Sequence, residues 1–270
     1  MYARDRTAVV AAIVLLLLVI GAVVGPLVIT ADPAQQLLSL RRSPPDREHL
    51  LGLDHLGRDI LARLVHGARY TLLASGGATI LISVAGLFIG VVAGYYGRWV
   101  DQILMRIVDV ALAFPYFLAA IVIVAVLGPD LKNAILAVAF AKIPVYTRVV
   151  RSVVLQAREM PYTEAARSLG CGDARIMLRH IVPNVILPAI VLSTTEMASV
   201  VLALAGLSFL GLGAQPPVSE WGLMLSEAKG YVSQAPHMLL APGIALAVLV
   251  LSINLAGDGL RFAVDPRSRR

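Results

Sequence analysis

The stretch Ala-Val-Val-Ala-Ala-Ile-Val-Leu-Leu-Leu-Leu-Val-Ile-Gly-Ala-Val-Val-Gly-Pro-Leu-Val-Ile, residues 8–29, decides the class of fold because it runs 22 residues without a charge. A helix rises 1.5 Å per residue, so about 20 apolar residues cross the hydrocarbon of a bilayer. The whole chain agrees, with 58% hydrophobic residues, 15% charged residues and a mean hydropathy of +0.81. Such a chain has too little charge to cover a globular surface. We expect an all-α, polytopic membrane helix bundle.

Apolar runs of spanning length recur along the chain and predict six transmembrane helices. The predicted spans are residues 8–29, 71–95, 103–127, 131–150, 185–212 and 239–256. Arg4 and Arg6 precede the first run, as basic residues precede the apolar region of a signal peptide. That run exceeds the roughly 7 to 15 residues of such a region, and no Ala-x-Ala site follows closely. We therefore expect a retained membrane anchor.

The basic residues give the orientation. With the N-terminus inside, about two thirds of the 23 Lys and Arg fall on the inner side, among them Lys142 and Arg148. Both termini are thus predicted to face the cytoplasm. The pI near 9.8 reflects this asymmetry. Nucleic-acid binding is not indicated, because no basic patch interleaved with aromatic residues is present.

The loop between the fourth and fifth runs contains a small-residue helix outside the spans, Glu-Ala-Ala-Arg-Ser-Leu-Gly at residues 164–170. Pro161 suits its first turn, and Gly170 and Gly172 supply the left-handed freedom that ends it. Asp173 is predicted to cap a second short helix that runs through Ile181. The loop is therefore expected to fold into two short helices around a Gly-x-Gly corner.

This compact shape suits a docking element. Ala165 and Ala166 leave it thin enough to enter a groove on a partner, while Arg167 and Arg175 offer charge to the rim of that groove. A second interpretation stays open, in which the loop is basic only because it orients the protein and contacts nothing.

The loop resembles the coupling helix of permease subunits of bacterial ABC importers, in the spacing Glu-Ala-Ala, then Gly170, then Ile181-x-Pro183. Further segments resemble the dipeptide, oligopeptide and nickel group of these permeases and occur in the same order. These are residues 52–59, 107–109 with 114–115, 206–213, 215–217, 221–222 and 254–261. The resemblance covers nearly the whole chain and is to the second permease of the pair. One departure is Leu204, where the family often has an acidic residue before Gly-Leu-Ser-Phe.

The resemblance implies an inner-membrane importer for short peptides, with nickel or another small solute as the alternative. It implies three domains: an anchor with external loop at 1–70, a transmembrane core at 71–260 and a basic tail at 261–270. It implies a second homologous permease, two ATPase subunits that bind ATP and Mg²⁺, and an external solute-binding protein. The residues expected to couple to the ATPases are Glu164, Ala165, Ala166, Arg167, Gly170 and Arg175. Those expected to contact the binding protein are Asp54, Arg58, Asp59 and Trp221.

Motifs for catalysis are missing from the sequence. It has no Gly-x-x-x-x-Gly-Lys-Ser/Thr, no Ser/His/Asp arrangement and no His-x-x-x-His pair. His49, His55 and His66 share the outer loop without the spacing of a ligand set, so no metal site is predicted. The single cysteine, Cys171, is interpreted as a small residue in a turn. We expect no catalytic residue and no cofactor in this chain.

Glu196 lies about a dozen residues into the fifth predicted span, where a free carboxylate is costly. It either lines the translocation path and meets the cationic end of a peptide, or packs against a polar neighbour. An ion-coupled secondary transporter is a rival function, but it needs several intramembrane acids and an inverted repeat. A membrane scaffold without transport is a second rival, and co-purification with ATPases separates it from an importer.

Three smaller features complete the predictions. Gly86, Gly90 and Gly94 form a smooth strip that packs either inside the bundle or against a sister permease. An apolar stripe from Ile60 to Val65, with Arg63 opposite, predicts a short helix lying on the outer membrane face. Trp221 is predicted to anchor at the same interface.

Overall fold

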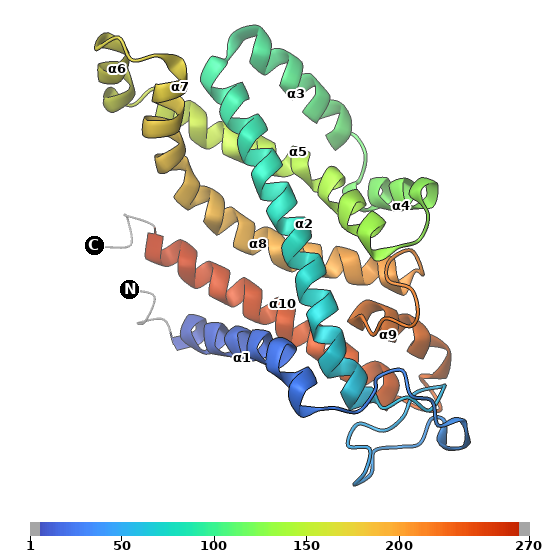
Figure 1. Ribbon diagram of the computed structural model, residues 1–270. Coiled ribbons are helices and arrows are strands. Elements are labelled where there is room, and N and C mark those ends of the chain that lie inside the picture. Colours follow the sequence, from blue (N-terminus) through green and yellow to red (C-terminus); the bar gives the residue numbers. More distant parts are fainter. Residues whose placement is uncertain (1–5, 265–270) are drawn as a thin grey trace.

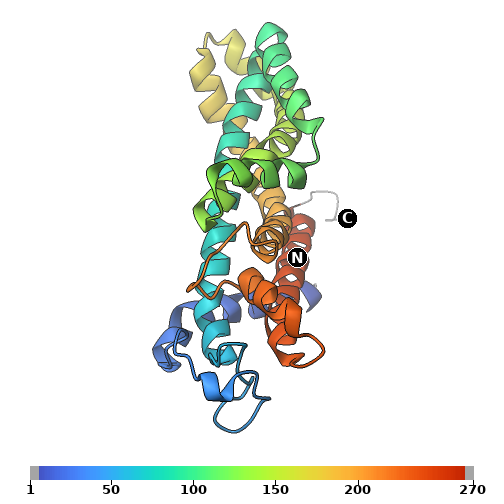
Figure 2. The ribbon, with the colours of Figure 1, turned by 90° about the vertical axis from the view of Figure 1, so that its right-hand side faces the viewer.

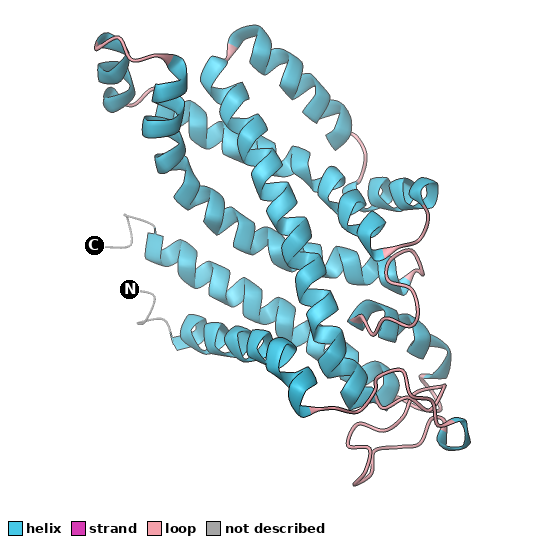
Figure 3. Ribbon diagram, viewed as in Figure 1, coloured by secondary structure: helices cyan, strands magenta, loops and turns pink. Residues whose placement is uncertain are grey.

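The computed structural model describes residues 6–264, and this part of the chain is almost entirely helical, without a β-strand (Figures 1 and 3). The α-helices are α1 (Arg6–Val28), α2 (Ile60–Tyr96), α3 (Arg98–Leu112), α4 (Tyr116–Leu127), α5 (Leu131–Arg158), α6 (Pro161–Ser168), α7 (Asp173–Ile176), α8 (Val182–Phe209), α9 (Trp221–Ala228) and α10 (His237–Val264). Short 3₁₀ turns occupy Leu38–Leu40 and Lys229–Tyr231, and a π turn occupies Met177–Ile181. Arg4 and most of the predicted basic tail lie outside the described residues.

Five helices within residues 6–264 are long and apolar enough to cross a membrane, and a bent pair makes up to six. The predicted polytopic bundle is therefore confirmed, and the third predicted span, residues 103–127, is interrupted by a bend. That segment consists of α3 and α4, whose axes differ by 84°. Pro115 precedes the first residue of α4, and proline both lacks an N–H and disfavours helix in the residue before it.

Helix α2 begins earlier than predicted, so the apolar stripe from Ile60 is not a separate surface helix. Asp59 starts α2 by accepting a hydrogen bond from the Ala62 N–H at 2.8 Å. The stripe packs inward, and Arg63, which we expected on the water side, is only 2% exposed.

The second helix of the inner loop also differs from the prediction. Residues 173–176 lead through the π turn directly into α8, so the short helix is the end of a long one. Gly172 has an ordinary φ of −68° and itself occupies the cap position, while Gly170 is at φ +77°. Asp173 is therefore not the cap. Its carboxylate accepts a hydrogen bond from the Tyr95 hydroxyl at 2.6 Å.

The glycine strip of α2 packs inside the bundle, as one of the two interpretations predicted. A Cβ built on Gly86, Gly90 or Gly94 would lie 2.6–2.8 Å from side-chain atoms of Tyr146, Val150 and Val154, all on α5. The three glycines thus let α2 and α5 approach more closely than larger residues allow. This contact forms the centre of the main apolar core.

Replacing Gly90 by alanine is expected to lower the free energy of unfolding by about 1–3 kcal/mol, because the added methyl overlaps Val150. Gly77→Ala on the same helix is the matched control, since nothing lies within 4 Å of its Cβ position. The control is expected to be neutral or slightly stabilising. Chemical unfolding in detergent measures both, and equal stabilities would contradict the close-packing account.

The helices run between two ends of the molecule. In Figure 1, α6, the start of α1 and the end of α10 lie on the left side of the bundle, while the loop of residues 29–59 and α9 lie on the right. Figure 2 shows α6 and this loop at opposite ends of the molecule. The His237 ring, at the start of α10, meets the Leu53 carbonyl of that loop at 3.4 Å. We call the end that contains α6 the α6 end, and the end that contains the loop of residues 29–59 the loop end.

Candidate functional site

Residues 161–172 form a protrusion at the α6 end, which we call the α6 protrusion. Pro161 occupies the first turn, and Gly170 ends the helix in the left-handed conformation. The Thr163 hydroxyl donates to the Ala157 carbonyl at 2.9 Å, and the Cys171 N–H donates to the Ala166 carbonyl at 3.1 Å. These bonds hold the protrusion as a fixed shape on the end of α5.

One face of the α6 protrusion is open to solvent. Five of the six residues predicted to couple to ATPases are exposed, namely Glu164, Ala165, Arg167, Gly170 and Arg175. The sixth, Ala166, is buried. Ala166 is 5% exposed and packs against the bundle core, so its methyl group is not available to a partner in this structure. Leu169 is 84% exposed and gives the protrusion an apolar tip that the sequence interpretation missed.

The α6 protrusion is connected to three long helices. Only Glu159 and Met160 separate it from α5, and α7 leads from it into α8. Asp173 accepts the hydrogen bond from Tyr95 near the end of α2, and Arg158 donates to the Tyr95 carbonyl at 3.1 Å. The protrusion and the residues next to it are thus connected to α2, α5 and α8.

A buried ion pair joins α5 to α8 in the middle of the bundle. The Lys142 ammonium lies 2.8 Å from Glu196 Oε2 and also donates to the Ser199 hydroxyl at 2.8 Å. Lys142, which we counted among the cytoplasmic residues, is 6% exposed and lies inside α5, a helix of spanning length. Its four-carbon stem follows the helix and delivers the charge to a partner inside the bundle. Lys142 is the polar neighbour that one of the two interpretations of Glu196 required.

The loop end holds a second buried charge network. Arg58 contacts Asp54 at 2.6 Å and Glu227 at 2.9 Å, while Arg63 pairs with Asp54 and lies 2.7 Å from Glu227. Glu227 belongs to α9, so the network fixes α9 to the loop and to α2. Burial raises the pKa of Asp54, but hydrogen bonds from backbone N–H groups and the charges of Arg63 and Arg58 outweigh it and lower the pKa overall.

Burial corrects the predicted contacts with a solute-binding protein. Asp54, Arg58 and Trp221 are 3%, 4% and 2% exposed, which leaves their side chains almost no surface for a second protein. Asp59 caps α2 and meets His49 Nδ1 at 2.9 Å. Trp221 is not an interfacial anchor, because its indole N–H donates to the Leu64 carbonyl inside the fold at 2.8 Å.

Three possible metal ligands, on Asp54, His55 and Glu227, lie within 4.8 Å of one another. The two carboxylates already pair with Arg58 and Arg63, whose guanidinium groups repel a cation. The donor set therefore fits an ion-pair network better than a metal.

Glu220 caps α9 from a buried position at the loop end. Its carboxylate accepts hydrogen bonds from the N–H groups of Gly222 and Leu223 at 2.9 and 3.0 Å. Burial raises the pKa of Glu220 above its usual 4.5, although these hydrogen bonds act in the opposite direction.

The raised pKa of Glu220 predicts a pH dependence. The folded state binds this proton more tightly than the unfolded state, so its contribution to stability is lost as the pH rises through the folded-state pKa. Glu220→Gln keeps the acceptor oxygen and cannot ionise. We expect its melting temperature, relative to the wild type, to increase from about pH 5 to about pH 8. Parallel curves for the two proteins would contradict the raised pKa.

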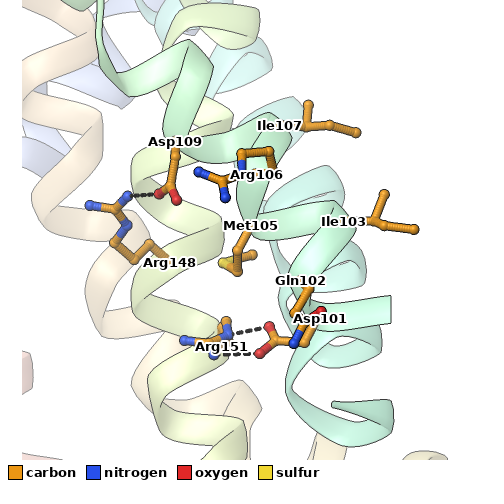
Figure 4. Close-up of a pocket in the computed structure, with 9 residues that line it drawn as sticks. All are labelled: Asp101, Gln102, Ile103, Met105, Arg106, Ile107, Asp109, Arg148 and Arg151. Atoms are coloured by element: carbon orange, nitrogen blue, oxygen red, sulfur yellow. Dashed lines mark hydrogen bonds and ion pairs between the residues drawn. The ribbon is translucent and has the colours of Figure 1, made fainter. Parts of the chain in front are cut away.

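A groove of about 770 Å³ separates parts of α3 and α5 (Figure 4). Asp101 pairs with Arg151, and Asp109 pairs with Arg148, across the groove. Ile103 and Ile107 point away from α5, so α3 has one charged and one apolar face (Figure 4). Both side chains of the Asp109–Arg148 pair are 53% exposed.

The sequence of this chain matches two models of known protein families. The model described as "binding-protein-dependent transport system inner membrane component" matches residues 86–270. The chain belongs to this permease family. The N-terminal transmembrane domain of oligopeptide transport permease C matches residues 2–45, which agrees with the resemblance of the whole chain to the dipeptide and oligopeptide group.

Several permeases of this kind are similar to the chain over most of its length. The dipeptide transport system permease protein DppC of Alkalihalophilus pseudofirmus is 41% identical over 98% of this chain and 88% of its own length. The di/tripeptide permease DppC of Pseudomonas aeruginosa is 39% identical over 98% of this chain and 90% of its own length. The glutathione permease GsiD of Pectobacterium atrosepticum is 44% identical over 83% of this chain and 74% of its own length.

Solved structures support the fold. A structure of the MetNI methionine ABC transporter in inward-facing conformations aligns with a TM-score of 0.61 and 23% identity. The alignment covers 75% of this chain and 96% of the other. It shows a shared arrangement of helices.

Proposed function

We propose that this permease carries short peptides as one half of the translocation path of an ABC importer. The observation that carries the proposal is the 39–41% identity, over 98% of this chain, to permeases named for dipeptides and di/tripeptides. In this assembly a second homologous permease completes the path, two ATPase subunits bind ATP and Mg²⁺, and an external solute-binding protein delivers the peptide. The permease supplies a path and a lever, and the chemistry belongs to the ATPases.

The α6 protrusion is the lever in this proposal. Its apolar tip at Leu169 and the charged side chains of Glu164 and Arg167, with Arg175 next to it on α7, suit an amphipathic groove on an ATPase subunit. Closure of the ATPases then displaces the protrusion, and its connections to α2, α5 and α8 convert that displacement into movement of the spans. Access to the path switches from one side of the membrane to the other.

The lever fixes the orientation. If α6 meets cytoplasmic ATPases, the start of α1 and the end of α10 face the cytoplasm as well, since all three lie on the same side of the bundle (Figure 1). The basic residues support the same orientation in the bacterial inner membrane. The three predicted domain boundaries remain part of this proposal.

Uptake into proteoliposomes tests the function. The permease pair, the ATPases and the binding protein are reconstituted, and accumulation of a labelled dipeptide is followed with and without ATP. ATP-dependent accumulation that unlabelled dipeptide competes and nickel does not is the expected result. Competition by nickel, without competition by unlabelled dipeptide, would favour the alternative that the importer carries nickel. Uptake driven by an ion gradient without ATPases would overturn the importer assignment.

A further inference from the structure

The Lys142–Glu196 pair lies well inside two helices that are long and apolar enough to cross a membrane. Glu196 is 13 residues before the end of α8, about 20 Å, and the continuous helix that begins at Asp173 runs for 23 residues before it. Lys142 is 11 residues after the start of α5 and 16 before its end. Their side chains are 7% and 16% exposed, so neither reaches bulk water at a helix end.

Stability does not explain this pair. Burying two charges costs several kcal/mol in desolvation, and well-packed apolar residues of similar volume usually hold two helices at least as firmly. Ionisable residues at mid-membrane depth are therefore more often retained for transport than for packing.

An interrupted helix meets the pair, which is an independent observation. The ring of Tyr116, the first residue of α4, lies 4.6 Å from the Lys142 ammonium. Helix α4 starts at the 84° break after α3, and Pro115 gives it no side-chain cap. Broken backbone at membrane depth is tolerated where protein or a water-filled path covers it, and transporters commonly build substrate sites from such half-helices.

We propose that Lys142 and Glu196 form a binding station for the two charged ends of a zwitterionic peptide, which rests on the proposed function. Glu196 accepts hydrogen bonds from the peptide ammonium. Lys142 donates to the peptide carboxylate, and the positive end of α4 beside it adds attraction for the same group. In the empty protein the two residues neutralise each other, so no charge is left alone when the peptide departs.

Ser199 and Tyr116 complete the station. The Ser199 hydroxyl already bonds to Lys142, and it is placed to hold the ammonium while Glu196 turns to the peptide. The half-exposed Tyr116 ring keeps the ammonium of Lys142 at the break of α3 and α4. When the peptide binds, the Lys142–Glu196 pair is exchanged for two pairs, one with each charged end of the peptide. A charged solute therefore passes through the bundle without an unpaired charge.

The test is a double variant in the complete reconstituted importer. Lys142→Met with Glu196→Met removes both charges, keeps the side-chain length and leaves no unpaired charge, although the Ser199 hydroxyl loses its bond to Lys142. We expect stimulated ATP turnover within about twofold of the wild type, while dipeptide uptake per ATP falls about tenfold or more, as loss of two charged hydrogen bonds predicts. The charge-exchanged variant, Lys142→Glu with Glu196→Lys, retains one acid and one base but places the acid at the Tyr116 ring, so it is expected to recover only part of the uptake.

The matched control removes another ion pair between helices, through Arg148→Met with Asp109→Leu. Its uptake per ATP is expected to stay at the wild-type value. Wild-type uptake per ATP in the methionine variant, or an equal loss in the control, overturns the station. Loss of stimulated ATP turnover in both Lys142–Glu196 variants also overturns it, by marking the pair as structural. Absence of peptide uptake by the wild type would instead refute the proposed function.

Discussion

Replacing Gly170 by valine is expected to abolish stimulated ATP turnover of the assembled importer while membrane insertion stays normal. Gly170 has φ +77°, a conformation that a β-branched residue adopts only at a cost of about 1–3 kcal/mol. The cost falls on the turn that ends α6, so we expect the exposed face of the protrusion to lose its shape. Stimulated ATPase activity in proteoliposomes measures the effect, and we expect a loss of at least about tenfold.

Gly172→Val is the matched control two residues away. Gly172 has φ −68° and no atom within 4 Å of its Cβ position, so valine adds the same bulk without backbone strain. We expect turnover within about twofold of the wild type. Gly170→Asn, which tolerates positive φ better, is expected to recover part of the activity. Full stimulation in Gly170→Val would refute the lever.

Replacing Arg63 by methionine is expected to destabilise the loop end by about 3–5 kcal/mol, because it removes one partner from a buried ion network. Asp54 and Glu227 would then share only Arg58, with one carboxylate charge left unbalanced. Arg63 is 2% exposed, so water cannot replace it. We expect a lower melting temperature in detergent and less folded protein in membranes.

Arg69→Met provides the control for this effect. Arg69 lies on the same helix but is exposed, so its replacement removes the same charge from a position outside the buried network. We expect a change within about 0.5 kcal/mol. Equal stability of both variants would mean that the buried network contributes nothing beyond its apolar contacts.

The α6 protrusion was readable from the sequence because its signals are local. Pro161 and Gly170 mark the two ends of one short helix, and each acts through its own backbone preference. The π turn that joins α7 to α8 left no such signal. The exposure of Leu169 also escaped prediction, because it depends on which face of α6 the bundle covers.

Sequence alone determined that this is a membrane bundle with a protruding helix in the loop between α5 and α8, because apolar run length and turn residues act locally. Only the tertiary structure decided which charges are buried and with whom. Lys142 meets Glu196 across 54 residues, and Arg58 meets Glu227 across 169. Such pairs follow from how helices pack in space, since a long side chain finds its partner by proximity in the fold, and local sequence carries no record of that distance.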